Sequence, residues 1–218
     1  MKKIFPLCIF FLAYYTPEGF AQIPENGSYL WNSTSITYSL NDKTELVLGN
    51  KDHYSSQINR LDYFHFELIG YRKLSKDFSL GMGLRQTESY KSEQWNPGQT
   101  YMLYGVYFLN PGNMKIRFAN RLASKTYKFS ETQYGLDNNT SVDFFVRSTN
   151  MLPKPYLADE VFTSLNTGKV HSIRLYGGFH VLQKKHFGID LYYCYWTTRP
   201  VDDWKNYNVL GLSTKVRI

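Results

Sequence analysis

The feature that most constrains this chain is an alternation of apolar and polar residues that recurs along most of its length. In segment 187–196 every odd position is apolar or aromatic, while the even positions include Gly188, Asp190 and Cys194. Segments 63–68, 78–85, 115–122, 172–181 and 210–218 show the same pattern. A period of two is the spacing of a β-strand with one apolar face. No segment after residue 22 shows a helical period, so we predict an all-β protein.

The alternating segments predict eleven strands. They fall near residues 29–40, 44–50, 60–72, 78–88, 100–109, 114–129, 141–149, 156–165, 170–181, 187–197 and 207–218. Most exceed the five or six residues usual in soluble strands and match the roughly 9 to 11 tilted residues that cross a bilayer. We therefore predict a single antiparallel up-and-down transmembrane β-barrel of about 10–12 strands. A soluble calycin-like barrel is the alternative fold, because alternation does not say which face points inward.

The strand count and the connections add two further expectations. Bacterial single-chain barrels have even strand numbers. Either one strand is missed or merged, therefore, or the first segment lies outside the wall. Short turns are expected at 41–43, 75–77, 110–113 and 183–186, and longer polar loops at 50–59, 88–99, 130–140 and 198–206. Adjacent Asp159 and Glu160 break the alternation unless a bulge intervenes.

The first 21 residues predict export. Lys2 and Lys3 precede an apolar run at 4–15, and Ala21 stands before Gln22, which is the order of a cleavable signal peptide. The apolar run is too short for a membrane-spanning helix. We predict a signal peptide at 1–21, a barrel at 22–218 and a location in the bacterial outer membrane. Cleavage removes Cys8 and leaves one cysteine, so no intramolecular disulfide can form.

Composition agrees with this location. The chain has 19 Tyr, 15 Phe and 4 Trp, and membrane barrels place aromatic rings at both interfaces. The formal net charge is +7, but Lys and Arg are scattered singly, so no nucleic-acid partner is expected. The expected partners are outer-membrane lipid and lipopolysaccharide. An envelope protein or a glycan is a further expected partner, bound by aromatic residues in the predicted loops (Tyr90, Trp95, Tyr134 and Trp204).

The ordered hairpins resemble a known family. The residues that carry the resemblance are Leu30-Trp31, segment 71–80 (YRKLSKDFSL), segment 155–162 (PYLADEVF) and segment 173–178 (IRLYGG). They resemble the outer-membrane β-barrel family grouped as domain of unknown function 2490. The resemblance covers nearly the whole mature chain and implies an outer-membrane barrel of Gram-negative bacteria. It implies no activity.

Charged residues gather on the face expected to line the lumen. The lumen-lining candidates are Glu67, Arg85, Lys115, Arg117, Arg121, Asp143, Arg147, Arg174 and Asp190. In a narrow barrel such charges pair and fill the space. In a wider one they form a basic constriction that favours anions. The sequence therefore favours a structural or binding barrel of unknown cargo, with a small anion-tolerant pore as the alternative.

The sequence offers no credible catalytic constellation. A third hypothesis, an outer-membrane lipid hydrolase, needs a Ser–His pair. His171 and Ser172 are adjacent and should face opposite sides of a strand. His65 and Glu67 share a face, which predicts a luminal hydrogen-bonded pair, and His53 lies near Ser55. We expect no enzyme activity, no cofactor and no metal, because histidine and cysteine spacing gives no zinc ligand set.

Overall fold

The computed structural model describes residues 27–91, 93–128, 130–144, 153–199 and 203–218. The predicted signal peptide and Arg147 lie outside these residues and stay predictions. All elements in the described part of the chain are strands, and it contains no helix long and apolar enough to cross a membrane. The all-β prediction is confirmed.

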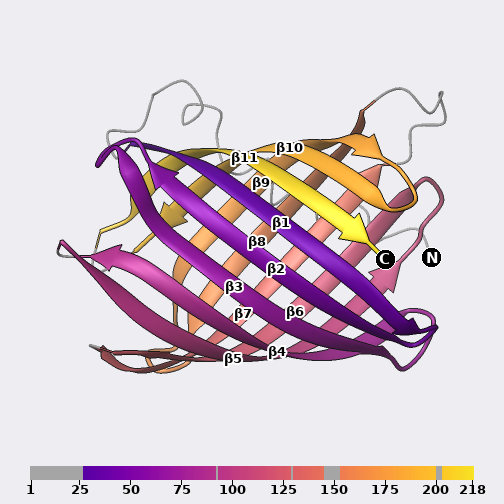
Figure 1. Cartoon of the computed structure of the whole chain (residues 1–218), viewed down its shortest axis with the longest axis horizontal. Helices are drawn as coiled ribbons and strands as arrows, with labels where there is room; N and C mark the ends of the chain where they lie inside the picture. The colour runs from indigo at the N-terminus through magenta and orange to yellow at the C-terminus, as the bar shows by residue number, and fades with distance from the viewer. Residues whose placement is uncertain (1–26, 92, 129, 145–152, 200–202) are drawn as a thin grey trace.

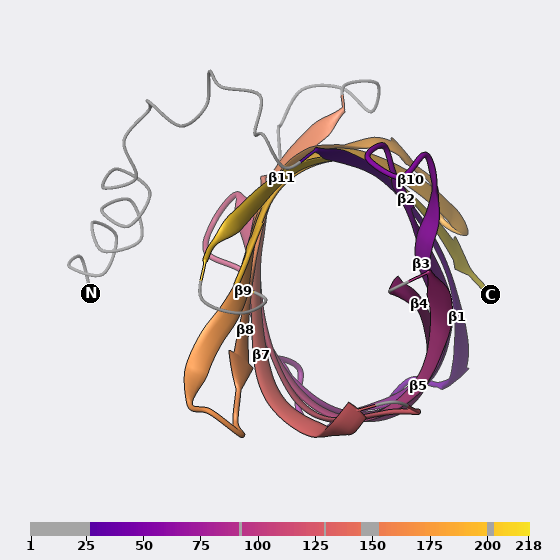
Figure 2. The ribbon, with the colours of Figure 1, turned by 90° about the vertical axis from the view of Figure 1, so that its left-hand side faces the viewer.

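Eleven strands form one closed barrel (Figures 1 and 2). Each pairs antiparallel with the next along the chain. The strands are β1 (Ser28–Asn41), β2 (Thr44–Ser55), β3 (Arg60–Lys73), β4 (Phe78–Lys91), β5 (Gln94–Leu109), β6 (Met114–Tyr127), β7 (Ser130–Phe144), β8 (Lys154–Ser164), β9 (Lys169–Gln183), β10 (Phe187–Thr198) and β11 (Lys205–Arg217). The up-and-down barrel of about 10–12 strands is confirmed.

The barrel closes between its first and last strands. β1 and β11 run parallel, with Ser28 paired to Asn208 and Thr37 paired to Arg217 at the two ends of the ladder. An up-and-down barrel with an odd number of strands must contain one such parallel pair, because its first and last strands run in the same direction. Each of the eleven predicted segments overlaps one strand of the described residues, and the first segment lies in the wall. The expectation of an even count was wrong.

The predicted contrast between short turns and long loops was also wrong. We call the end with the connections after β1, β3, β5, β7 and β9 the first rim, and the other end the second rim. At the second rim the strands continue through the predicted loops. The connections there are residues 56–59 between β2 and β3, 92–93 between β4 and β5, and 128–129 between β6 and β7. The longest connection, 145–153, belongs to the first rim. Tyr90, Trp95 and Tyr134 therefore lie in strands.

The apolar face of the wall points outward. Leu80, Met82 and Leu84 of β4 are between 46% and 68% exposed, whereas Ser79 and Thr87, on the opposite face of the same strand, are buried. The other strands repeat this arrangement, with Phe66, Leu103, Leu122, Phe179, Leu191 and Leu210 all exposed. A water-soluble barrel has the opposite polarity, because burial of apolar surface stabilises its inside.

The pair Asp159 and Glu160 needs no bulge. The ladders that β8 makes with β7 and β9 are continuous through both residues. Glu160 bonds Arg174 inside the barrel, so Asp159 lies on the outer face.

Tyrosine and glycine form a recurrent pair on the inner face. Where Tyr192 is paired directly with Gly211, the ring occupies the space that a β-carbon at position 211 would need. The same arrangement recurs at Tyr71 and Gly81, Tyr127 and Gly98, and Tyr156 and Gly178. An aromatic ring over a cross-strand glycine covers the backbone and keeps the ring against the wall. These pairs fit bulky rings into a narrow lumen.

Candidate functional site: a cationic luminal cavity

A cavity with a volume of about 720 Å³ lies in the lumen. Its lining reaches from Asp62 and Lys91 near the second rim to Ile69 and Tyr71 further down the wall. Among the described residues, seven cationic side chains line it: Lys51, Arg85, Lys91, Arg117, Arg121, Lys125 and Arg174. Four carboxylates line it as well: Asp62, Glu67, Asp137 and Glu160. The cavity therefore carries an excess of positive charge.

Three ion pairs hold part of this charge against the wall. Arg85 donates from Nε and Nη2 to Glu67 Oε2, at 3.0 and 2.7 Å. Arg121 donates in the same way to Asp137 Oδ2, at 2.8 and 2.5 Å. Arg174 Nη1 donates to Glu160 Oε2 at 3.1 Å.

Each of these pairs joins residues that lie directly opposite one another on neighbouring strands. Opposite charges in this position stabilise a sheet. Because the pairs run along the wall instead of across the lumen, they leave the cavity between them.

The Arg174–Glu160 pair belongs to a larger cluster that reaches across several strands. We call Trp31, Lys51, His53, Glu160 and Arg174 the Trp31–Arg174 cluster. Trp31 is stacked on His53, with 4.2 Å between ring centres, and the Lys51 ammonium lies 3.9 Å from the centre of the Trp31 ring. The Arg174 guanidinium lies 4.8 Å from the same ring. Cation–π contacts of this kind hold both cations in place without neutralising them.

Two more aromatic rings fix the guanidinium of the cluster. Arg174 lies 4.7 Å from the Phe162 ring centre and 5.3 Å from that of Trp196. Tyr176 donates to Glu160 Oε2 at 2.7 Å, so this oxygen accepts from both a hydroxyl and a guanidinium. The aromatic surroundings orient the charged groups and leave them little freedom.

Several polar atoms of the cluster have no hydrogen-bond partner among the described residues. They are buried and comprise Trp31 Nε1, His53 Nε2 and Arg174 Nε. An indole N–H and a guanidinium N–H can only donate. The cluster therefore lacks acceptors and not donors. Each unpartnered buried donor costs about 1–3 kcal/mol.

Beside the cavity, apolar side chains pack along the inner face of the wall. Met102 and Val106 point inward from β5, yet each is at most 3% exposed. They form one buried cluster with Ile69, Tyr104 and Ala119. These residues belong to β3, β5 and β6, so the apolar packing covers one side of the lumen.

The sequence-predicted lumen residues divide into two groups. Glu67, Arg85, Arg117, Arg121 and Arg174 line the cavity. Lys115, Asp143 and Asp190 lie away from it, and Arg147 lies outside the described residues.

A separate polar network accounts for the two aspartates that lie away from the cavity. His180 bonds Asp190 at 2.7 Å through Nδ1 and Asp143 at 3.3 Å through Nε2. Lys215 Nζ lies 2.6 Å from the second oxygen of Asp190. The Lys115 ammonium lies 5.0 Å from the Phe108 ring centre.

Sequence reasoning missed six charged members of the site: Lys51, Asp62, Lys91, Lys125, Asp137 and Glu160. Lys51 and Asp137 lay in predicted loops, and Glu160 was noted only as a break in the pattern. Leu48 is exposed, and Gly49 and Lys51 follow it on the opposite, inward face. Extending this alternation along β2 could have identified Lys51. No comparable signal marks Asp137 before its pairing with Arg121 is known.

Ser172 and His65, two of the residues considered for catalysis, have other partners. Trp196 Nε1 donates to Ser172 Oγ at 2.9 Å, and the Ser172 hydroxyl donates to the carbonyl of Thr197. Its single proton is thus engaged away from His171. His65 lies 2.9 Å from the Tyr63 hydroxyl and 3.8 Å from Glu67.

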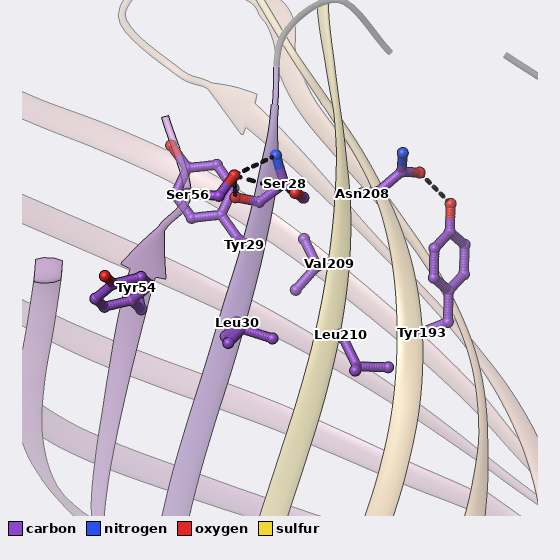
Figure 3. Close-up of a pocket in the computed structure, with 9 residues that line it drawn as sticks. All are labelled: Ser28, Tyr29, Leu30, Tyr54, Ser56, Tyr193, Asn208, Val209 and Leu210. Atoms are coloured by element: carbon purple, nitrogen blue, oxygen red, sulfur yellow. Dashed lines mark hydrogen bonds between the residues drawn. The ribbon is translucent and has the colours of Figure 1, made fainter. Parts of the chain in front are cut away.

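A smaller groove opens on the outer face at the parallel seam (Figure 3). It has a volume of about 300 Å³ and lies between Leu30, Tyr54, Tyr193 and Leu210. Tyr193 donates to the side-chain oxygen of Asn208 beside it. The groove is apolar and lies apart from the charged lumen.

A family model described as protein of unknown function (DUF2490) matches residues 29–207. The chain belongs to this family. The match reaches from β1 into β11 and contains both the Trp31–Arg174 cluster and the rest of the luminal cavity. The family resemblance noted in the sequence is confirmed, and membership of DUF2490 assigns no activity. A search of curated proteins found no match.

Proposed function

We propose that this protein is an outer-membrane β-barrel that binds a small anionic solute in its lumen. The excess of cationic side chains around the cavity carries the proposal. An anion would add the acceptors and the negative charge that the lining lacks.

The outer wall supports the membrane part of the proposal. Its exposed leucine, phenylalanine and tyrosine side chains would be unfavourable in water and favourable against lipid. Strands of 11 to 16 residues are long enough to cross a bilayer while tilted. The family match agrees with a barrel of unknown cargo.

Binding is favoured over conduction because ion pairs and aromatic contacts hold the cavity cations in place and apolar side chains narrow the lumen beside them. Met102 and Val106 are almost completely buried on the inner face, so apolar packing narrows the lumen beside the cavity. We assign the protein no catalytic step, since the Ser172 proton is engaged by a backbone carbonyl.

The proposal is tested in two steps. A membrane barrel should be recovered with outer membranes and should change its gel mobility on boiling. Recovery as a soluble protein with no mobility shift would overturn the membrane assignment.

The purified barrel in detergent should then bind acetate or phosphate more tightly than a monovalent organic cation such as ethylammonium. Isothermal titration at constant ionic strength measures both affinities. Equal affinities, or tighter binding of the cation, would overturn the anion preference.

A further inference from the structure

The charges of the Trp31–Arg174 cluster do not balance. Lys51 and Arg174 are both basic and both line the cavity, and Glu160 is the one carboxylate of the cluster. The contacted oxygen of Glu160 already accepts from Arg174 and from Tyr176. Among the described residues, the Lys51 ammonium forms no ion pair within 4.0 Å and contacts the Trp31 ring instead. The cluster therefore has one more basic side chain than it has carboxylates.

The hydrogen bonds of the cluster show a second, independent imbalance, between donors and acceptors. The Trp31 side chain is 1% exposed, and its indole N–H has no acceptor among the described residues. Arg174 Nε likewise lacks an acceptor, and His53 Nε2 lacks a partner. A buried polar group without a partner is unusual in a native fold, so these donors call for an acceptor that the wall does not supply.

The surrounding wall makes this arrangement a built site. The Arg174 guanidinium is held between the rings of Trp31, Phe162 and Trp196, at 4.7 to 5.3 Å from their centres. A pre-oriented guanidinium loses little conformational freedom when it binds an anion.

The donor types indicate the ligand chemistry. A guanidinium presents several N–H groups in a plane, and an ammonium presents a compact positive charge. Together they suit a group with two or three negatively charged oxygens, which is a carboxylate or a phosphate.

We propose that the Trp31–Arg174 cluster is an oxyanion site, in which Lys51 and Arg174 bind the carboxylate or phosphate group of a solute held in the cavity. The site rests on the proposed function and names the part of the lumen that recognises the solute. The aromatic residues position the two cations. Glu160 limits the net charge of the site to about one unit.

The experiment titrates the purified full barrel with sodium acetate and, separately, with inorganic phosphate at constant ionic strength. Tryptophan fluorescence is the readout, because Trp31 and Trp196 both lie beside Arg174. Saturation with phosphate alone identifies a phosphate site, and saturation with acetate alone identifies a carboxylate site. Lys51→Met keeps the apolar stem and removes the charge, and should weaken binding at least about tenfold.

Three further variants make the result specific. Glu160→Gln removes the competing carboxylate and should tighten binding. Lys125→Met removes a cavity cation outside the cluster and should cause a smaller loss than Lys51→Met. Lys184→Met alters an exposed turn at the first rim and should leave binding unchanged. The gel mobility shift on boiling confirms that each variant is folded.

The failures can be told apart. If the native barrel binds neither anion, the proposed function fails together with this site. If the native barrel binds an anion but Lys51→Met and Lys125→Met lose affinity equally, the cavity attracts anions only through its overall charge. In that case the oxyanion site is wrong and the proposed function stands.

Discussion

The Tyr192 ring lies over Gly211, its directly paired neighbour on β11, and fills the space of the missing β-carbon. Both residues belong to the part of the wall that leads into the parallel seam, since Gly211 is paired on its other side with Trp31. The pair thus connects the packing of the lumen to the closure of the barrel.

A methyl group at position 211 should disturb this packing. Gly211→Ala must displace the Tyr192 ring, and overpacking of a core costs about 1–3 kcal/mol. We expect a lower temperature for the boiling-dependent mobility shift and a lower urea midpoint. Gly105→Ala is the matched control, because the nearest atom to its new β-carbon is 3.9 Å away. Equal stability of the two variants would contradict the role given to the glycine.

A charge on the outer wall tests whether that wall meets lipid. Met82 is 68% exposed and lies between exposed Leu80 and Leu84. In a bilayer, Met82→Arg should destabilise the barrel by up to about 4 kcal/mol, whereas in water an exposed arginine costs almost nothing. Gln86→Arg, on the same face nearer the second rim, should cost about 0–1 kcal/mol. Unfolding in lipid vesicles measures both, and a harmless Met82→Arg would argue against a membrane-facing wall.

The packed part of the lumen should block ion flow. We expect the native barrel to give no steady channel current in planar bilayers. Met102→Ala removes a buried inward side chain that packs with Ile69 and Tyr104 at the edge of the luminal cavity, and should produce conductance steps. Leu103→Ala, on the adjacent outward position, is the control. A large steady current through the native protein would instead support the anion-tolerant pore.

The thiol of Cys194 should report on unfolding. Its side chain has no exposed surface and packs with Trp31, Tyr192 and Val209. A maleimide reagent should therefore label the native barrel slowly and the urea-unfolded chain quickly. Lys184→Cys in the exposed turn supplies a site that should be labelled in both states. Rapid labelling of native Cys194 would show that this cluster opens readily.

The strands were predictable wherever the outer face is apolar. In β10 the alternation places Asp190 and Cys194 inside and Leu191 outside, as the structure has them. β7 was placed too far along the chain because Gln133, Asp137 and Asn139 look like loop residues. They form a strand because the lumen is polar there: Arg121 binds Asp137, and Arg117 donates to Asn139.

The site was less predictable than the wall because it depends on register. Glu67 meets Arg85 because the register of β3 and β4 places them opposite one another. Their separation in sequence does not reveal this register. The contact between Arg174 and Trp31 needs the closed barrel, since it joins β9 to β1 past two intervening strands. Lys51 was missed for a local reason, as its polar neighbours Asn50 and Asp52 suggest a loop.

The parallel seam has a consequence for sidedness. Because β1 and β11 run in the same direction, the chain enters the wall at the second rim with Ser28 and leaves it at the first rim after Arg217. In an even-stranded barrel both ends would emerge at one rim. Across a membrane, the two ends of this wall would therefore face different compartments, and a short epitope next to Ser28 and one after Ile218 would be reached by antibody from opposite sides.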